Sequence, residues 1–284
     1  MKKKLAIIKK LFFQLFQLSL LTEMTASMYY EQLKQDSKYR DPRSLVAYGY
    51  KMYSQNDEDG MIREIFKRIG TTNKLFVEFG VGNGLENNTL ALLFEGWRGL
   101  WIEGDSRFAE AMRNGFKKIL ASGRLMLAQS FITKENINGL IAARISEKEI
   151  DLLSVDIDGN DYEVLKAITT ISPRVIVIEY NAKFVPPLVW SMGYNETHAW
   201  KEDDNMGASL KFLELKLKDK GYSLVGCNLS GSNAFFVKSE LAGDRFLTPY
   251  TAEQHYETAR YYLSRGMRGG SAPSYEALDN GVFF

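Results

Sequence analysis

The stretch from Leu75 to Asp105 constrains the fold more than any other part of the sequence. A short apolar and aromatic run over 75–79 predicts a buried strand, and a helical stretch over roughly 88–95 is followed by a second apolar run that ends in Glu103. Between the first strand and the helix lie three glycines at alternate positions, Gly80, Gly82 and Gly84. Strand, glycine turn, helix, strand and carboxylate is the order of a nucleotide-binding βαβ unit.

The rest of the chain extends this pattern. Apolar runs that predict strands alternate with helical stretches, at 75–79, 100–102, 125–128, 151–155 and 174–178. Two further runs, 222–226 and 234–238, flank a Gly-Ser-Asn turn and predict an antiparallel hairpin at the end of the sheet. The expected fold is therefore α/β, with a doubly wound, mostly parallel sheet whose ligands bind at the carboxyl ends of its strands.

Composition limits the function classes. The net charge is +1, which gives no electrostatic case for a nucleic-acid partner. The only cysteine, Cys227, cannot form an internal disulfide, so a reducing, cytoplasmic location is favoured. We expect three regions: an N-terminal helical extension over 1–48, a Rossmann-like domain over 49–247 and a C-terminal helical tail over 248–284.

The N-terminal segment is basic and apolar. Lys2, Lys3 and Lys4 precede an apolar stretch that Lys9 and Lys10 interrupt. The run from Leu11 to Leu21 is too short to span a bilayer and predicts an amphipathic helix. Three roles stay open: covering a core or dimer surface, peripheral membrane contact, and a cleaved signal peptide. Short helices are expected over 22–52.

The glycine turn does not follow the GxGxxG spacing of dinucleotide sites, because Gly84 lies only two residues after Gly82. Glu78 and Glu86 flank the turn, and negative charge there disfavours a pyrophosphate. A cationic or zwitterionic ligand such as S-adenosylmethionine fits the negative charge around this turn better than a pyrophosphate does. Glu103, at the end of the next strand, can accept hydrogen bonds from two ribose hydroxyls.

A second set of polar residues follows the later strands. It comprises Asp156, Asp158, Asp161, Glu179 and Asn181. Clustered carboxylates at one sheet edge need compensating charge, and their oxygens suit Mg²⁺, Mn²⁺ or Ca²⁺. A bound metal could lower the pKa of a sugar hydroxyl. Two alternatives stay open: a metal-free general base at Asp156, Asp158 or His198, and a purely structural turn and helix cap.

The sequence also supports predictions for three other segments. Ser54 or Asp57 could cap the helix that follows, or Gln55 and Asp57 could reach the ligand. The aromatic, proline-containing segment 184–207 predicts a loop over the strand ends and contains His198. A terminal helix is expected over 251–264, with His255 on the surface.

Six motifs together resemble the FkbM-type branch of class I S-adenosylmethionine-dependent methyltransferases. They are SQNDEDG (54–60), VEFGVGNG (77–84), WIEGD (101–105), SVDIDGNDYEVL (154–165), IEYNAKF (178–184) and GYSLVGCNLSGSNAFFVK (221–238). The resemblance covers about residues 50–240. It implies a seven-stranded sheet with a reversed last strand, and O-methylation, often of sugars in glycolipids, natural products or surface polysaccharides. It also implies that Asp156, Glu179 and Asn181 resemble the oxygen-ligand set of metal-dependent O-methyltransferases.

The predicted function is therefore transfer of a methyl group from S-adenosylmethionine to a hydroxyl of a sugar or glycan. The candidate cofactor-binding residues are Gln55, Asp57, Glu78, Gly80, Gly82, Asn88, Glu103, Ser130 and Asp156. The candidate catalytic residues are Asp156, Asp158 and His198. Two alternatives are a nicotinamide-dependent oxidoreductase on the same fold and a non-catalytic partner that binds cofactor or glycan.

Overall fold

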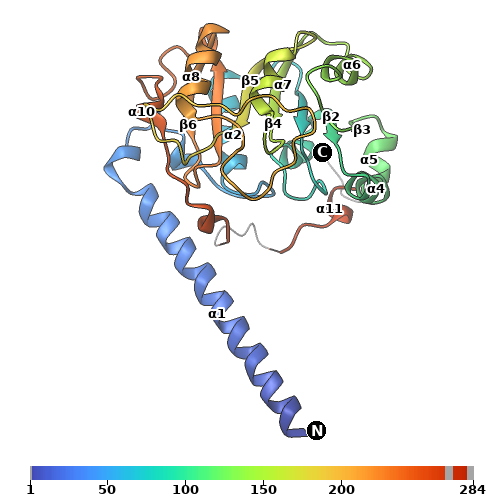
Figure 1. The fold of residues 1–284 in the computed structure, drawn as a ribbon, viewed down its shortest axis with the longest axis vertical. Helices are drawn as coiled ribbons and strands as arrows, with labels where there is room; N and C mark the ends of the chain where they lie inside the picture. The colour runs from blue at the N-terminus through green and yellow to red at the C-terminus, as the bar shows by residue number, and fades with distance from the viewer. Residues whose placement is uncertain (1, 266–270, 280–284) are drawn as a thin grey trace.

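The computed structural model describes residues 2–265 and 271–279 and contains a central seven-stranded sheet (Figure 1). Its strands are β1 (Leu75–Phe79), β2 (Arg98–Glu103), β3 (Leu125–Gln129), β4 (Glu149–Val155), β5 (Ser172–Glu179), β6 (Tyr222–Cys227) and β7 (Asn233–Lys238). Each predicted strand is present within two residues of its expected bounds. Local apolar runs placed them correctly because most strands are buried on both faces, whereas β3 at the edge of the sheet is partly exposed.

The strand order is β3-β2-β1-β4-β5-β7-β6. The first five strands pair in parallel, whereas β7 pairs antiparallel with both β5 and β6. The order reverses between β1 and β4, so the carboxyl ends of these strands flank a crevice of the kind that binds ligands in open α/β sheets. The predicted doubly wound sheet with a reversed last strand is confirmed.

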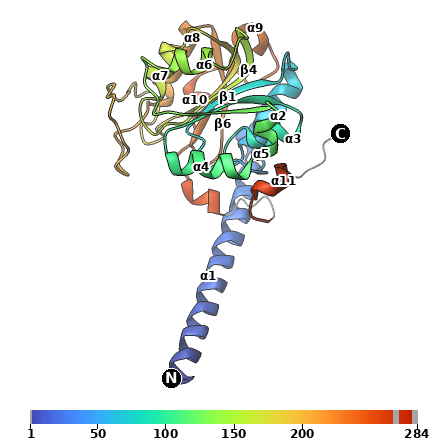
Figure 2. The same cartoon turned by 90° about the vertical axis from the view of Figure 1, so that its right-hand side faces the viewer.

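Helices cover both faces of this sheet (Figure 2). The described helices are α1 (Lys2–Lys34), α2 (Glu58–Ile69), α3 (Leu90–Phe94), α4 (Ser106–Gly115), α5 (Lys117–Ala121), α6 (Ile137–Ala142), α7 (Asp161–Ala167), α8 (Leu210–Asp219), α9 (Ser239–Ala242), α10 (Ala252–His255) and α11 (Tyr275–Asp279). Three short 3₁₀ turns are η1 (Ser37–Tyr39), η2 (Val46–Tyr48) and η3 (Tyr261–Arg265). Side chains of α6, α7 and α8 pack into one core layer, and those of α2, α3, α4 and α5 into the other.

The N-terminal helix is longer than expected. The short helices predicted over 22–52 are wrong for 22–34, because α1 continues unbroken to Lys34 through a segment without Gly or Pro, whereas η1 and η2 do lie in the remainder. It projects from the body as a single rod (Figures 1 and 2) and meets it through Ala26 and Tyr30, which are buried. Among the described residues, no helix combines the length and apolar character needed to cross a membrane.

The C-terminal segment is not the single helix predicted over 251–264. It forms α10, an irregular stretch and η3, and in the irregular stretch the Arg260 N–H donates to Ser230 O at 2.7 Å, in the turn between β6 and β7. His255 is buried, so its predicted surface position is wrong. Glu257 accepts hydrogen bonds from Lys38 (2.6 Å) and Tyr39 (2.8 Å), which ties the two ends of the chain together.

Candidate active site

A cavity of about 800 Å³ lies at the carboxyl ends of β1, β2, β4 and β5. Its walls come from the glycine turn after β1, the start of α4, the loop after β3, the turn after β4, and η3. The loop over 184–207 contributes His198, Trp200 and Met206, so it covers the strand ends as predicted. This volume suits a ligand of cofactor size.

Gly80 allows two strand ends to approach closely. Its φ is +69°, and a Cβ at this position would lie 1.7 Å from the backbone oxygen of Asp156. Gly82 also has a positive φ, +56°, but a Cβ there would meet nothing within 4 Å. Both glycines line the cavity, as expected for a turn that brings backbone close to a ligand.

Glu103 faces the same cavity from the end of β2. Its Oε2 accepts the Gly82 N–H at 2.8 Å, and its Oε1 accepts the Asp105 N–H at 2.7 Å. Burial raises the pKa of this carboxyl above its usual range. Each oxygen retains a second lone pair, so this geometry allows bonds from two adjacent ribose hydroxyls, and the ribose role of Glu103 stays a prediction.

Glu78 is not among the residues that line the cavity, so its cofactor role stays a prediction that the cavity does not support. Only 3% of it is exposed, and its carboxylate accepts from Asn87 Nδ2 (2.6 Å), Asn88 N (2.8 Å) and Thr89 Oγ1 (2.5 Å). The Asn88 amide is likewise directed inward, donating to Ser154 Oγ at 3.1 Å. Burial raises the pKa of Glu78. These residues shape the turn after β1 and do not line the cavity.

In the segment before α2, one residue lines the cavity and others hold the start of the helix. Gln55 lines the cavity as expected, but Asp57 does not. Tyr30 Oη donates to Asp57 Oδ2 at 3.1 Å, and burial raises the pKa of Asp57 to about 7. Asp57 occupies the N-cap position of α2 without a side-chain capping bond. The capping is done by Ser54 and Asp59, since the Asp59 N–H donates to Ser54 Oγ (3.2 Å) and Asp59 Oδ2 accepts the Ser54 N–H (2.8 Å).

Three carboxylates meet at the carboxyl ends of β4 and β5. One oxygen each of Asp156, Asp161 and Glu179 lies within 4.8 Å of the others. Burial, followed by repulsion from neighbouring carboxylates, raises the pKa of both Asp156 and Glu179 well above the usual range. Glu179 Oε2 is a buried atom without a hydrogen-bond partner among the described residues. The predicted juxtaposition of Asp156 and Glu179 is therefore present.

The role of Asn181 as a metal ligand stays a prediction, and its Oδ1 accepts the Lys183 N–H at 3.2 Å. Its Nδ2 donates to the backbone oxygens of Asp204 (2.9 Å) and Met206 (3.1 Å), holding the end of the loop. The sequence placed Asp161 in the same acidic set, and the structure brings its carboxylate to those of Asp156 and Glu179. Asp161 Oδ1 accepts the Ile157 N–H at 2.8 Å, and Oδ2 accepts the Gly159 N–H at 2.9 Å. This tight turn directs Asp161 back towards the strand end.

Asp158 and His198 lie together on the cavity wall. His198 Nε2 is 3.2 Å from the backbone oxygen of Asp158. A carbonyl oxygen only accepts, so Nε2 carries the proton and Nδ1 is the nitrogen that can accept one. Burial raises the pKa of the Asp158 carboxyl, and the nearby His198 opposes that shift. Ser130, at the end of β3, also lines the cavity as predicted.

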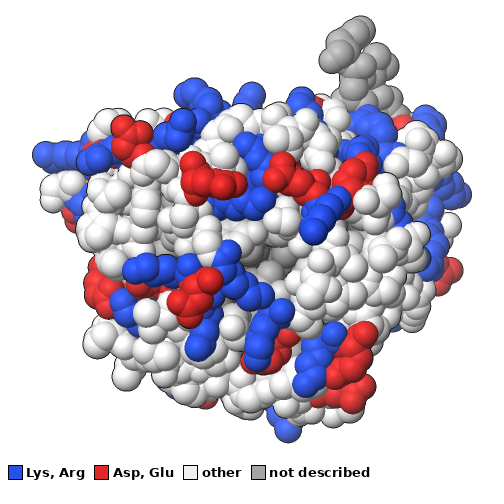
Figure 3. Space-filling model, turned by 90° about the horizontal axis from the view of Figure 1, so that it is seen from above, with Lys and Arg blue, Asp and Glu red and all other residues white. Residues whose placement is uncertain are grey.

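The lining of the cavity is strongly acidic. It includes six carboxylates, Glu86, Glu103, Asp105, Asp156, Asp158 and Glu179, and no lysine or arginine among the described residues. Such a cavity favours a ligand that carries positive charge, and disfavours a diphosphate. The surface away from α1 differs: there, basic and acidic side chains are interspersed (Figure 3).

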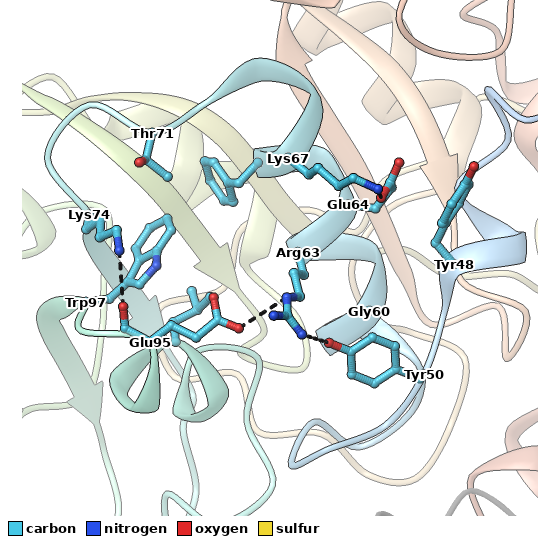
Figure 4. A pocket seen from close by; sticks show the side chains of 12 residues that line it. Tyr48, Tyr50, Gly60, Arg63, Glu64, Lys67, Thr71, Lys74, Glu95 and Trp97 are labelled. Atoms are coloured by element: carbon cyan, nitrogen blue, oxygen red, sulfur yellow. Dashed lines mark hydrogen bonds and ion pairs between the residues drawn. The ribbon is translucent and has the colours of Figure 1, made fainter. Parts of the chain in front are cut away.

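A second cavity, of about 490 Å³, lies at the opposite edge of the sheet, near the amino ends of β1 and β2 (Figure 4). Its cationic side chains are already engaged. Arg63 contacts Glu95 at 3.5 Å and Tyr50 Oη at 3.3 Å, and Lys74 Nζ donates to Glu95 O at 3.2 Å. Ligands of open α/β sheets bind at the carboxyl edge, so the acidic cavity is the candidate active site.

We compared the chain with solved structures and with curated protein sequences. Among solved structures, the chain is similar to the N-terminal domain of EvdMO1 with SAH bound, with 14% identity, a TM-score of 0.43, and coverage of 73% of this chain and 94% of that one. It is also similar to a putative caffeoyl-CoA O-methyltransferase from Staphylococcus aureus, with 13% identity, a TM-score of 0.42, and coverage of 63% and 81% respectively. Curated protein sequences give no significant match.

The family comparison is more direct. The model of the methyltransferase FkbM domain matches residues 80–224, just over half of the chain. The matched region contains the glycine turn, Glu103, the three clustered carboxylates and the loop that covers them. It supports a methyltransferase over the oxidoreductase and non-catalytic alternatives. The chain is an S-adenosylmethionine-dependent methyltransferase that belongs to the FkbM family.

Proposed function

We propose that this enzyme methylates a hydroxyl group of a sugar or glycan. The observation that carries the proposal is that one cavity contains both Glu103, suited to a ribose, and the carboxylates Asp156 and Glu179, suited to a hydroxyl. A methyl donor held at the glycine turn and an acceptor held at the ends of β4 and β5 would therefore be neighbours. Proximity and alignment of this kind contribute much of the rate enhancement in group transfer.

The donor half of the cavity is formed by Gly80, Gly82, Glu103, Gln55 and Ser130. S-Adenosylmethionine supplies an electrophilic methyl group on a positively charged sulfur. The chain contributes open backbone at the glycine turn, a carboxylate oriented by two N–H groups, and an acidic wall that favours the positive charge. Asp156 belongs to both halves of the cavity because its backbone contacts Gly80.

In the acceptor half, we propose that Asp156, Asp161 and Glu179 hold a divalent cation. The residues fit such an ion because their oxygens converge and Glu179 Oε2 has no other partner among the described residues. Oxygen ligands of this kind suit Mg²⁺ or Mn²⁺, which would lower the pKa of a bound hydroxyl. The three side chains would orient the acceptor, and the positive charge of the ion would offset the repulsion between the three carboxylates.

A metal-free mechanism has its own supporting observation. The Asp158 carboxyl and His198 lie side by side on the cavity wall, and Nδ1 of His198 is free of the bond that occupies Nε2. Either group could accept the hydroxyl proton as a general base. The acceptor class is supported by aromatic side chains on the cavity wall, Phe108, Phe131, Trp200 and Tyr261, which offer flat surfaces beside polar groups.

The test is methyl transfer from labelled S-adenosylmethionine to a panel of free, nucleotide-linked and lipid-linked sugars, with and without a chelator. Asp156→Asn is expected to lower turnover about a hundredfold or more, because it removes the group placed next to the acceptor hydroxyl. Its affinity for S-adenosylmethionine, measured by calorimetry, should stay within a few-fold of wild type. Glu86→Gln, which alters another carboxylate of the same cavity, is the matched control.

The outcomes separate the two mechanisms. Loss of turnover with chelator and recovery with Mg²⁺ or Mn²⁺ supports the metal-dependent route. Full turnover in chelator, combined with loss in His198→Gln or Asp158→Asn, supports the general base. Near-normal turnover of Asp156→Asn removes this residue from the chemistry, and absence of transfer to every sugar contradicts the proposed acceptor class.

A further inference from the structure

The outer part of α1 exposes an unusual number of large apolar side chains. They are Ile7, Ile8, Leu11, Phe12, Phe13, Leu15, Phe16, Leu18, Leu20 and Leu21, with Phe12 72% exposed and Phe16 67% exposed. This part of the helix extends beyond the body (Figures 1 and 2). Apolar surface of this extent marks an interaction site in a folded protein.

The charged side chains in the same part of the sequence are all positive. Lysines occupy positions 2, 3, 4, 9 and 10, and the first acidic residue of the chain is Glu23. The sequence therefore has five lysines within its first ten residues and no acidic residue among them. Lysine side chains have long apolar stems that lie along apolar surface while their ammonium groups reach polar surroundings.

We infer that α1 attaches the enzyme to the surface of a lipid bilayer that contains anionic headgroups. The phenylalanine and leucine side chains would enter the boundary between headgroups and acyl chains, and the lysines would contact the headgroups. The strength of such binding rises with the apolar area that enters the bilayer and with the electrostatic attraction of the lysines to anionic headgroups.

A second copy of α1 fits this surface less well. At about 100° per residue, Lys10, Gln14 and Gln17 form one narrow stripe, Lys9 and Ser19 lie outside it, and apolar side chains occupy most of the remaining circumference. A two-stranded coiled coil buries only a narrow seam and would leave most of that surface in water. Parallel pairing would also place the two lysine clusters side by side.

The inner end of α1 is held firmly by the body. Tyr30 Oη donates to Gly49 O (3.2 Å) and Asp57 (3.1 Å), and Lys34 Nζ donates to Gly49 O (3.1 Å). Tyr29 stacks on Tyr262 of η3 at a ring distance of 6.4 Å. Because η3 also lines the active-site cavity, the attachment to a membrane would lie beside the rim of that cavity. The helix is thus positioned to orient the enzyme.

The experiment is flotation of the full-length protein with vesicles of phosphatidylcholine alone or mixed with phosphatidylglycerol. Wild-type protein is expected to float with the anionic vesicles, and increasing salt should weaken the binding. Phe12→Asp combined with Phe16→Asp should abolish flotation. Lys9→Gln combined with Lys10→Gln should weaken binding to anionic vesicles about thirtyfold, since each lysine near the surface contributes a several-fold effect.

The matched control is Lys216→Gln combined with Lys218→Gln, which makes the same charge change at exposed positions of α8. It should bind like wild type. Thermal unfolding should be unchanged in all three variants, because the substituted side chains lie outside the core. Flotation of the double aspartate variant like wild type overturns the inference. So does a failure of wild type to bind either vesicle, or a stable dimer in solution whose α1 resists proteolysis.

Discussion

At the scale of single residues, the glycine turn shows how identical amino acids can have different tasks. Gly80 is required by the closeness of the two strand ends, because any Cβ would overlap the backbone oxygen of Asp156. Gly82 faces open space, so only its positive φ favours glycine. The alternate spacing visible in the sequence did not distinguish the two.

This contrast gives a matched pair of variants. Gly80→Ala is expected to lower the free energy of unfolding by about 3 kcal/mol or more, because backbone must move as well as adopt a strained φ. Gly82→Ala should cost only about 1–2 kcal/mol, the cost of the left-handed conformation. Urea unfolding measures both values. Equal losses for the two variants would contradict the close contact between Gly80 and Asp156.

Glu103 is the residue expected to recognise the ribose of the methyl donor. Glu103→Gln should weaken S-adenosylmethionine binding about tenfold to a hundredfold, because it replaces one charged acceptor oxygen by a donor. Calorimetry measures the affinity, and Glu86→Gln provides a control of the same size and charge change on the same cavity. An affinity equal to that of wild type would remove Glu103 from the donor site.

At the scale of elements, Glu58 joins α2 to the hairpin formed by β6 and β7. Its buried carboxylate accepts from Asn56 N (2.8 Å), Asn228 Nδ2 (2.7 Å) and Asn233 Nδ2 (2.9 Å). Two motifs that lie about 170 residues apart in the sequence therefore meet at one side chain. Asn56 lines the active-site cavity, so this contact also positions part of the site.

Glu58→Gln should lower the free energy of unfolding by about 2–4 kcal/mol, because an amide NH₂ would face amide donors in a buried position. Glu110→Gln, on the exposed face of α4, is the control and should change stability by less than about 0.5 kcal/mol. Chemical denaturation gives both values. A small effect at Glu58 would show that the hairpin holds its position without this carboxylate.

The strands also show which features of the site could not be predicted from the sequence. The patterns located each strand end, and hence placed Glu103, Asp156 and Glu179 at one edge of the sheet. They did not give the direction of individual side chains. Glu78 lies within β1, on the opposite side of the strand from Val77 and Phe79, and is covered by the turn that leads to α3.

At the scale of the whole molecule, buried groups of the C-terminal segment make folding sensitive to acid. Burial lowers the pKa of His255 from 6.5 to about 4, so the unfolded chain takes up this proton first as the pH falls. The stability that depends on neutral His255 is complete above about pH 6.5 and is lost as the pH falls towards 4.

At about pH 5 the expected loss from this residue is about 2 kcal/mol relative to neutral pH. His255→Leu should flatten the dependence of stability on pH between these values, even if its stability at neutral pH is lower. His198→Gln, which changes the other histidine of the chain, should keep the wild-type slope. Thermal or urea unfolding across this range measures the slopes. A slope unaltered in His255→Leu would contradict the buried neutral imidazole.

The sequence by itself determined the sheet, the glycine turn, the loop over the strand ends and the acidic character of the site. These features depend on apolar runs, glycine spacing and residue type, which act over a few neighbouring positions. Only the tertiary structure decided that Glu78, Asp57 and Asn181 hold loops in place, and that Asp161 joins Asp156 and Glu179. The reason is that a carboxylate or amide is recruited by the nearest donors or acceptors, which distant segments supply after folding.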